Sequence, residues 1–302
     1  MTRLEVLHET RYDYAAPVSQ SHHLAHLRPL DDAHQSVQAW SLAIEPAADH
    51  RREAADAEGN ATCWFTLARA HDALAVTGRS VVEVQSRFDD LDPDASPPWD
   101  RVAAGLRYVS RRPYEPAVEY VQPSPYVPRL PALRDWAAPS LVPGRPLARA
   151  ALELMQRVHD EFTYETASTH VDTPLAQVME RRRGVCQDFA HVLTGALRMH
   201  GLPVRYVSGY LLTSTGADAP EMVGADASHA WVQAWCPLTP GVPGGWLDLD
   251  PTNRMVPASG HVRVAVGRDF GDVTPLRGVI RGGGQHRLAV GVTTRILSER
   301  PT

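Results

Sequence analysis

Three residues that together could carry out nucleophilic acyl transfer occur in order along the second half of the sequence: Cys186, His229 and Asp250. A cysteine nucleophile needs a base that accepts its proton and later donates one to the leaving group. The imidazole in turn needs an acceptor that fixes its tautomer. Taken singly, a strand histidine is more often structural, and an aspartate before a proline more often forms a turn. Together, their order and surroundings favour a catalytic triad.

The residues that follow Cys186 predict an amphipathic helix, because apolar side chains recur at i, i+3 and i+4 spacing and Gly201 lies where a C-terminal cap belongs. Cys186 therefore falls in the first turn, where the helix dipole and unpaired N–H groups favour a thiolate and can receive an oxyanion. Gly184 would let the backbone turn sharply and leave the sulfur uncrowded. We expect Asp188 to cap or stabilise the start of the helix.

The histidine and the aspartate lie in predicted strands. Residues 227–236 and 246–250 have strand-like patterns and are joined by a loop rich in Gly and Pro, which is typical of adjacent antiparallel strands. Such a pair of strands could place His229 and Asp250 side by side. Asp248 shares a strand face with Asp250 and is the alternative acid.

The whole sequence divides by composition into three parts. Residues 1–90 contain several short strand patterns separated by turn residues and predict a β-rich N-terminal domain, an antiparallel β-sandwich or half-barrel. Residues 91–146 form a proline-rich connector, with twelve prolines between Pro93 and Pro146. Residues 147–302 combine helices with later antiparallel strands and predict an α+β catalytic domain that includes the C-terminal strands.

Composition argues against several classes of protein. A net charge of −5 over 302 residues gives no sign of a nucleic-acid-binding surface. The three cysteines are widely spaced, which fits neither a disulfide framework nor a zinc or redox motif and suits a reducing compartment. No apolar run has the length of a signal peptide or a transmembrane helix. We therefore expect a cytoplasmic protein that binds neither nucleic acid nor membrane.

Three motifs resemble those of the transglutaminase-like superfamily and occur in its Cys, His, Asp order. They are GVCQDFA at residues 184–190, SHAWV at residues 228–232 and WLDLDPTN at residues 246–253. The N-terminal strands, with the turn at residues 56–60, look like the β-rich N-terminal domain of the bacterial transglutaminase-like proteins. Residues 267–273 look like their C-terminal segment.

This resemblance implies a papain-like α+β core in which the nucleophile helix packs on an antiparallel sheet. The chemistry of a Cys, His and Asp triad calls for no metal or organic cofactor. Asp250, which precedes Pro-Thr-Asn, matches the acid of the family's triad, and Asp248 is the fallback. The second oxyanion donor stays open. Tyr164 and Tyr210 are candidates for it, beside a purely structural role for each aromatic ring.

The expected function is cysteine-dependent acyl transfer on an amide of a peptide or protein substrate, through a thioester intermediate. An amidase or peptidase is the leading interpretation, because water is always present and the sequence shows no amine-binding pocket. A protein-glutamine transamidase (transglutaminase) is the first alternative. The second is a non-catalytic binding or scaffold protein, which the presence of all three triad residue types argues against.

Overall fold

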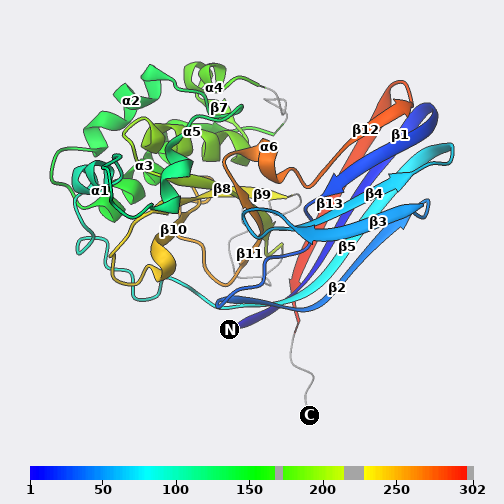
Figure 1. The fold of residues 1–302 in the computed structure, drawn as a ribbon, viewed down its shortest axis with the longest axis horizontal. Helices are drawn as coiled ribbons and strands as arrows, with labels where there is room; N and C mark the ends of the chain where they lie inside the picture. Colours follow the sequence, from blue (N-terminus) through cyan, green and yellow to red (C-terminus); the bar gives the residue numbers. More distant parts are fainter. Residues whose placement is uncertain (167–172, 214–227, 298–302) are drawn as a thin grey trace, which may run out of the picture.

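The computed structural model of the protein describes residues 1–166, 173–213 and 228–297. A long curled antiparallel sheet forms one side of the molecule, and a smaller antiparallel sheet covered by helices forms the other (Figure 1). Strands dominate the N-terminal part, and helices precede antiparallel strands in the second part. The predicted α+β fold class is confirmed.

β1 (Thr2–Ala25) is the strand around which the larger sheet is built. Near its start, alternate side chains such as Leu4, Val6 and His8 are buried, as in a strand with one packed face. Six further strands join it: β2 (Gln35–Glu45), β3 (His50–Ala55), β4 (Ala61–Leu67), β5 (His71–Val84), β12 (Leu276–Gly282) and β13 (His286–Ile296). They form one curled sheet, which corresponds to the half-barrel form of the prediction and not to two stacked sheets.

The last two strands of the chain belong to this N-terminal sheet. β13 pairs with the first half of β1, with Leu4 opposite Ile296, and β12 pairs with its second half. The sequence prediction had placed the C-terminal strands in the catalytic domain of residues 147–302, and the structure corrects it. Alternating hydrophobicity predicts a strand but does not say which sheet the strand joins. β1 has 24 residues and offers a long edge that β5 and β4 leave open.

The proline-rich connector forms four short helices, which are α1 (Trp99–Gly105), η1 (Pro116–Val121), α2 (Pro131–Ala137) and η2 (Ala138–Ser140). They lead into the longer helix α3 (Leu147–Glu161). Trp136 anchors the connector, because its indole N–H donates to Glu161 at 2.6 Å and its ring lies under the guanidinium of Arg157. Within the described ranges, no helix is long and apolar enough to cross a membrane.

The smaller sheet lies against the helix that begins at Cys186. Its order is β10-β9-β8-β11, and its strands are β8 (Val204–Leu211), β9 (His229–Trp235), β10 (Trp246–Leu249) and β11 (His261–Gly267). α5 (Cys186–Arg198) packs on β8 and β9 through apolar side chains such as Phe189 and Leu193. The remaining elements are β6 (Thr163–Tyr164), α4 (Leu175–Arg181), β7 (Arg183–Gly184), η3 (Pro243–Gly245) and α6 (Phe270–Val273). The predicted pairing of the histidine strand with the aspartate strand is confirmed.

Two buried amide side chains join the N-terminal sheet to β11. Asn60, in the turn between β3 and β4, accepts the N–H of Val266 and donates to the Val266 carbonyl, both at 2.8 Å. Gln35 makes the same pair of bonds with the backbone of Arg263, again at 2.8 Å each. Asp32 adds an ion pair to the Arg263 guanidinium at 2.6 Å. β11 is therefore fixed from the side of the larger sheet.

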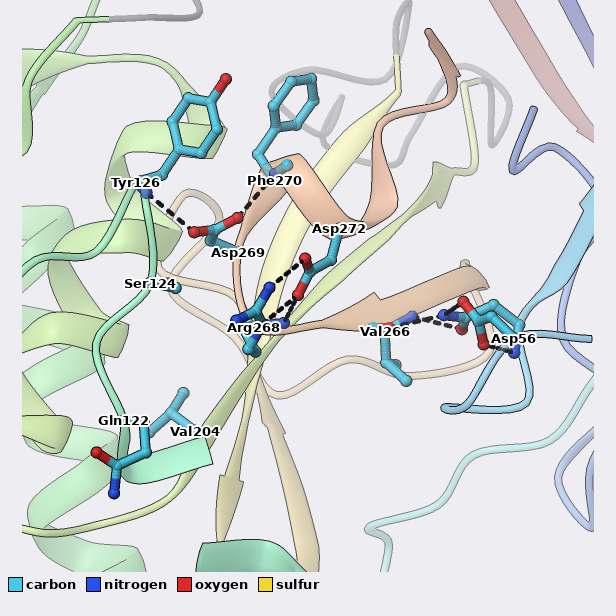
Figure 2. A network of polar contacts seen from close by, with 12 residues as sticks. Asp56, Gln122, Ser124, Tyr126, Val204, Val266, Arg268, Asp269, Phe270 and Asp272 are labelled. Atoms are coloured by element: carbon cyan, nitrogen blue, oxygen red, sulfur yellow. Dashed lines mark hydrogen bonds and ion pairs between the residues drawn. The ribbon is translucent and has the colours of Figure 1, made fainter. Parts of the chain in front are cut away.

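A second polar network ties the end of α5 to its surroundings, and Figure 2 shows the part of it around Arg268 and Asp269. Arg198, the last residue of α5, donates to the carbonyls of Val204 and Arg268, at 2.6 Å each. Burial lowers the pKa of Arg198 to about 10, so that the side chain stays charged at neutral pH. The neighbouring Asp269 accepts the backbone N–H of Tyr126 at 2.9 Å, and this bond attaches the connector.

Replacing Asn60 with alanine should destabilise the protein by about 2–5 kcal/mol, because both backbone groups of Val266 would lose their buried partner. The measurement is the free energy of unfolding from urea denaturation. Gln38→Ala is the control, since Gln38 is exposed and its loss should change stability by less than about 0.5 kcal/mol. Equal effects of the two substitutions would contradict the role given to Asn60.

Candidate active site

Cys186 is the first residue of α5 and is partly exposed. Val185 before it is extended, and Asp188 accepts the backbone N–H of Val185 at 2.9 Å, which fixes the entry to the helix. The first N–H groups of a helix have no partner within the helix, and the dipole there is positive. The predicted placement of the cysteine at a helix N-terminus is confirmed, as is the stabilising role of Asp188.

Gly184 serves a different purpose from the predicted sharp turn. Its backbone does not have a positive φ, whereas Arg182, at the end of α4, is left-handed with a φ of 52°. A Cβ on Gly184 would lie 2.6 Å from Oδ2 of Asp188 and 2.7 Å from its Cβ. Glycine is therefore required because the side chain that stabilises the helix start packs directly on it.

His229 and Asp250 meet across the smaller sheet. His229 is the first residue of β9, and Asp250 directly follows β10, so that the pairing of these two strands sets their distance. Nε2 of His229 lies 2.9 Å from Oδ2 of Asp250, and both side chains are fully buried. The structure thus brings together two of the predicted triad residues in a hydrogen-bonded ion pair.

The residues after Asp250 wrap around its carboxylate. Oδ1 accepts the backbone N–H groups of Thr252 at 2.9 Å and of Asn253 at 3.1 Å, and Oδ2 accepts the Asn253 amide at 2.8 Å. Burial by itself would raise the pKa of Asp250. The charge of His229 and the hydrogen bonds from His229 and His261 outweigh burial and hold the pKa far below its usual range. Asp250 is therefore both a turn former and an ionised partner of the histidine.

His229 has one ring nitrogen left for the cysteine. Nε2 is engaged by Asp250, while Nδ1 is buried and makes no hydrogen bond of ordinary geometry with the described residues. Burial lowers the pKa of His229, but the charge and hydrogen bond of Asp250 and, after them, the contact with Cys186 raise it to about 10. His229 is therefore a cation at neutral pH, with one ring nitrogen available to the cysteine.

Asp248, the fallback acid, contacts a different group. Its side chain is 2% exposed and pairs with Arg87 at 3.2 Å through both carboxylate oxygens. Arg87 follows β5, so that this ion pair also links the two halves of the molecule. The geometry selects Asp250 as the partner of His229.

The two tyrosines named as oxyanion candidates occupy different surroundings. Tyr164, on β6 beside β7, packs edge-on against Phe189 of the nucleophile helix, with ring centroids 6.1 Å apart. Tyr210 is fully buried and packs against His8 of the N-terminal sheet. Tyr206 lies near enough to Cys186 to respond to its charge. Burial, followed by the charge of Cys186, raises the pKa of its phenol well above the usual value.

β11 carries a residue of the candidate site that the sequence prediction missed. His261, its first residue, is 3% exposed, and its Nε2 lies 3.2 Å from Oδ2 of Asp250. No particular strand is predicted from the sequence at residues 261–267, although apolar residues alternate with other residues at the start of HVRVAV at 261–266. That alternation was the available signal for a strand. Among the described residues, no three His, Cys, Asp or Glu side chains are grouped to hold a metal ion.

Asp250→Asn should lower the pKa of His229, because the carboxylate charge is the largest influence that raises it. The imidazolium would then lose its proton at lower pH. In the pH profile of Cys186 alkylation by iodoacetamide, we expect the upper apparent pKa to fall by at least about one unit. Asp248→Asn is the matched control, equally buried but paired with Arg87. Shifts of equal size in both variants would rule out the assigned pairing.

Two regions of the chain match families of known proteins. Residues 4–83 match the bacterial transglutaminase-like N-terminal region, and residues 134–251 match the transglutaminase-like superfamily. An uncharacterized protein of Mycobacterium tuberculosis is 37% identical over 281 residues, which are 92% of this chain and 87% of that protein.

Two further proteins are similar to parts or all of the chain. A protein-glutamine gamma-glutamyltransferase of Pseudomonas aeruginosa is 31% identical over 118 residues, 37% of this chain and 17% of that protein. A solved structure from Cytophaga hutchinsonii, described as a candidate cysteine protease, has a TM-score of 0.75 at 20% identity and covers 100% of this chain and 92% of its own. The chain belongs to the transglutaminase-like superfamily, with the N-terminal region of its bacterial members.

Proposed function

We propose that the protein is a cysteine-dependent amidase or peptidase that acts on an amide of a peptide or protein. The observation that carries this proposal is the buried pair of His229 and Asp250, which leaves Nδ1 of the imidazolium for Cys186 at the start of α5. This is the arrangement that a thiolate nucleophile and its acid–base partner require.

The reaction divides into two steps. The Cys186 thiolate attacks the amide carbonyl, and the N–H groups of the first turn of α5 stabilise the oxyanion. His229 donates its Nδ1 proton to the amine as the C–N bond breaks, which leaves a thioester. His229 then takes a proton from water, the hydroxide attacks the thioester, and the acid and the thiolate are released. Asp250 keeps the imidazole oriented through both steps.

Tyr164 is the second oxyanion donor that we propose, since β6 runs beside the glycine that precedes the nucleophile. Two similar proteins support a peptide or protein as the substrate: one is described as a candidate cysteine protease, and the other is a protein-glutamine gamma-glutamyltransferase. We place the protein in the cytoplasm, because all three of its cysteines are free.

Transamidation is the second candidate function. The observation that favours it is the 31% identity to the Pseudomonas aeruginosa gamma-glutamyltransferase over 118 residues. The chemistry would share the thioester, and a primary amine would replace water in the second step.

Incubation with a glutamine-containing peptide and a labelled primary amine separates the two functions. We expect release of ammonia or of peptide fragments, without incorporation of the amine, and a loss of at least about 10³-fold in the Cys186→Ala variant. Incorporation of the amine would show transamidation instead.

The control substitution is Cys236→Ala, because Cys236 is fully buried and burial raises the pKa of its thiol to about 12. Activity should persist in that variant. If a thiol probe labels Cys186 no faster than it labels Cys63 or Cys236, the catalytic assignment is wrong.

A further inference from the structure

The carboxylate of the triad is shared by two histidines. Oδ2 of Asp250 lies 2.9 Å from Nε2 of His229 and 3.2 Å from Nε2 of His261. The two imidazoles come from β9 and β11, which are not neighbours in the sheet, and their ring centroids are 6.4 Å apart. One charged oxygen thus receives donors from both sides.

The contact between Nε2 of His261 and Oδ2 of Asp250 fixes the tautomer of His261. A nitrogen that faces a carboxylate oxygen at this distance must carry a proton, because two lone pairs would repel. Nδ1 of His261 is buried and has no hydrogen-bond partner within the described ranges. His261 also borders a cavity of about 10 Å³ that Arg87, Asp248 and Arg263 help to line, roughly the space that one water molecule needs.

We propose that His261 is a positioning residue that moderates the hold of Asp250 on His229 by taking part of the carboxylate's hydrogen-bonding capacity. This inference rests on the proposed function. A general acid works best when its pKa lies near the working pH, and a carboxylate bound to a single imidazolium in a dry interior would make that imidazolium a poor proton donor. The N–H of His261, added to those of His229 and Asn253 on the same oxygen, weakens the attraction between Asp250 and His229.

The other charges near His229 and His261 are largely neutralised by ion pairs. Arg87 pairs with Asp248, and Arg263 pairs with Asp32. The other titratable and charged groups beside the two histidines are Cys186 on α5, which acts on His229, and Asp248 on β10, Arg87 after β5 and Arg263 on β11, which line the cavity next to His261. Two more lie one contact further away: His159 on α3 contacts the carbonyl of Thr252, and Asp32 before β2 pairs with Arg263. His261 is the member of this set that contacts the triad carboxylate along with His229.

A purely structural role for His261 makes a different prediction. Its ring packs edge-on against Trp231, with centroids 5.4 Å apart, so that any substitution will cost some stability. Loss of packing would lower the midpoint of urea denaturation without moving the protonation of His229. A pH profile therefore separates the two roles.

The test compares His261→Leu, which removes the donor, with His261→Gln, whose amide nitrogen can reach Oδ2 but does not titrate. The full-length protein is used, and the readout is the pH profile of Cys186 alkylation by iodoacetamide. We expect the upper apparent pKa to rise by about one unit in His261→Leu and to stay near the wild-type value in His261→Gln. His261→Asn, too short to reach the carboxylate, replaces His261→Leu if the latter does not fold.

Two outcomes would overturn the inference: an upper apparent pKa that is unchanged in both variants, and one that falls in His261→Leu. The first would leave His261 as a packing residue, and the second would make it a support for the His229 pair. Alkylation needs no substrate, so this failure is distinct from failure of the proposed function. The latter would show as a wild-type Cys186 that reacts no faster than an ordinary thiol.

Discussion

The charge on Asp250 is the constraint on which the rest of the site depends. The carboxylate is completely buried, and a buried charge is tolerated only when it is paired and hydrogen-bonded. Its two oxygens are accordingly filled by His229, His261, Asn253 and the backbone of the turn that follows. Because these partners belong to different segments, satisfying one charge fixes β9, β11 and the turn after β10 relative to each other.

β11 transmits this constraint to the N-terminal sheet. Its first residue contacts Asp250, and its backbone is held by the side chains of Gln35 and Asn60. Arg87, at the end of the N-terminal strands, pairs with Asp248 two residues before the triad acid. The N-terminal sheet thus supports the candidate site, because without it several buried polar groups of the smaller sheet would lose their partners.

Features with a local physical cause could be predicted from the sequence. The helix at Cys186 follows from its apolar spacing, and the pairing of β9 with β10 follows from a short turn-rich loop between two strands. Features that depend on residues far apart in the sequence could not be predicted in this way. Nothing local shows that His261 faces Asp250 across the sheet, since this depends on strand order.

The same reason accounts for two smaller differences. The requirement for glycine at position 184 comes from the side chain of Asp188, which no turn pattern reveals. The placement of β12 and β13 depends on which strand edge in the whole protein is open, and a pattern of alternating residues carries no information on that.

The pairing of the first strand with the last has a consequence for biosynthesis. Leu4 lies opposite Ile296, so that the N-terminal sheet keeps an open edge until the end of the chain has left the ribosome. An unpaired edge can recruit strands from other chains, and contacts between residues so far apart in sequence form slowly. This edge of β1 is completed only after the smaller sheet and its helices have been synthesised, and until then the nascent chain must keep β1 from pairing elsewhere.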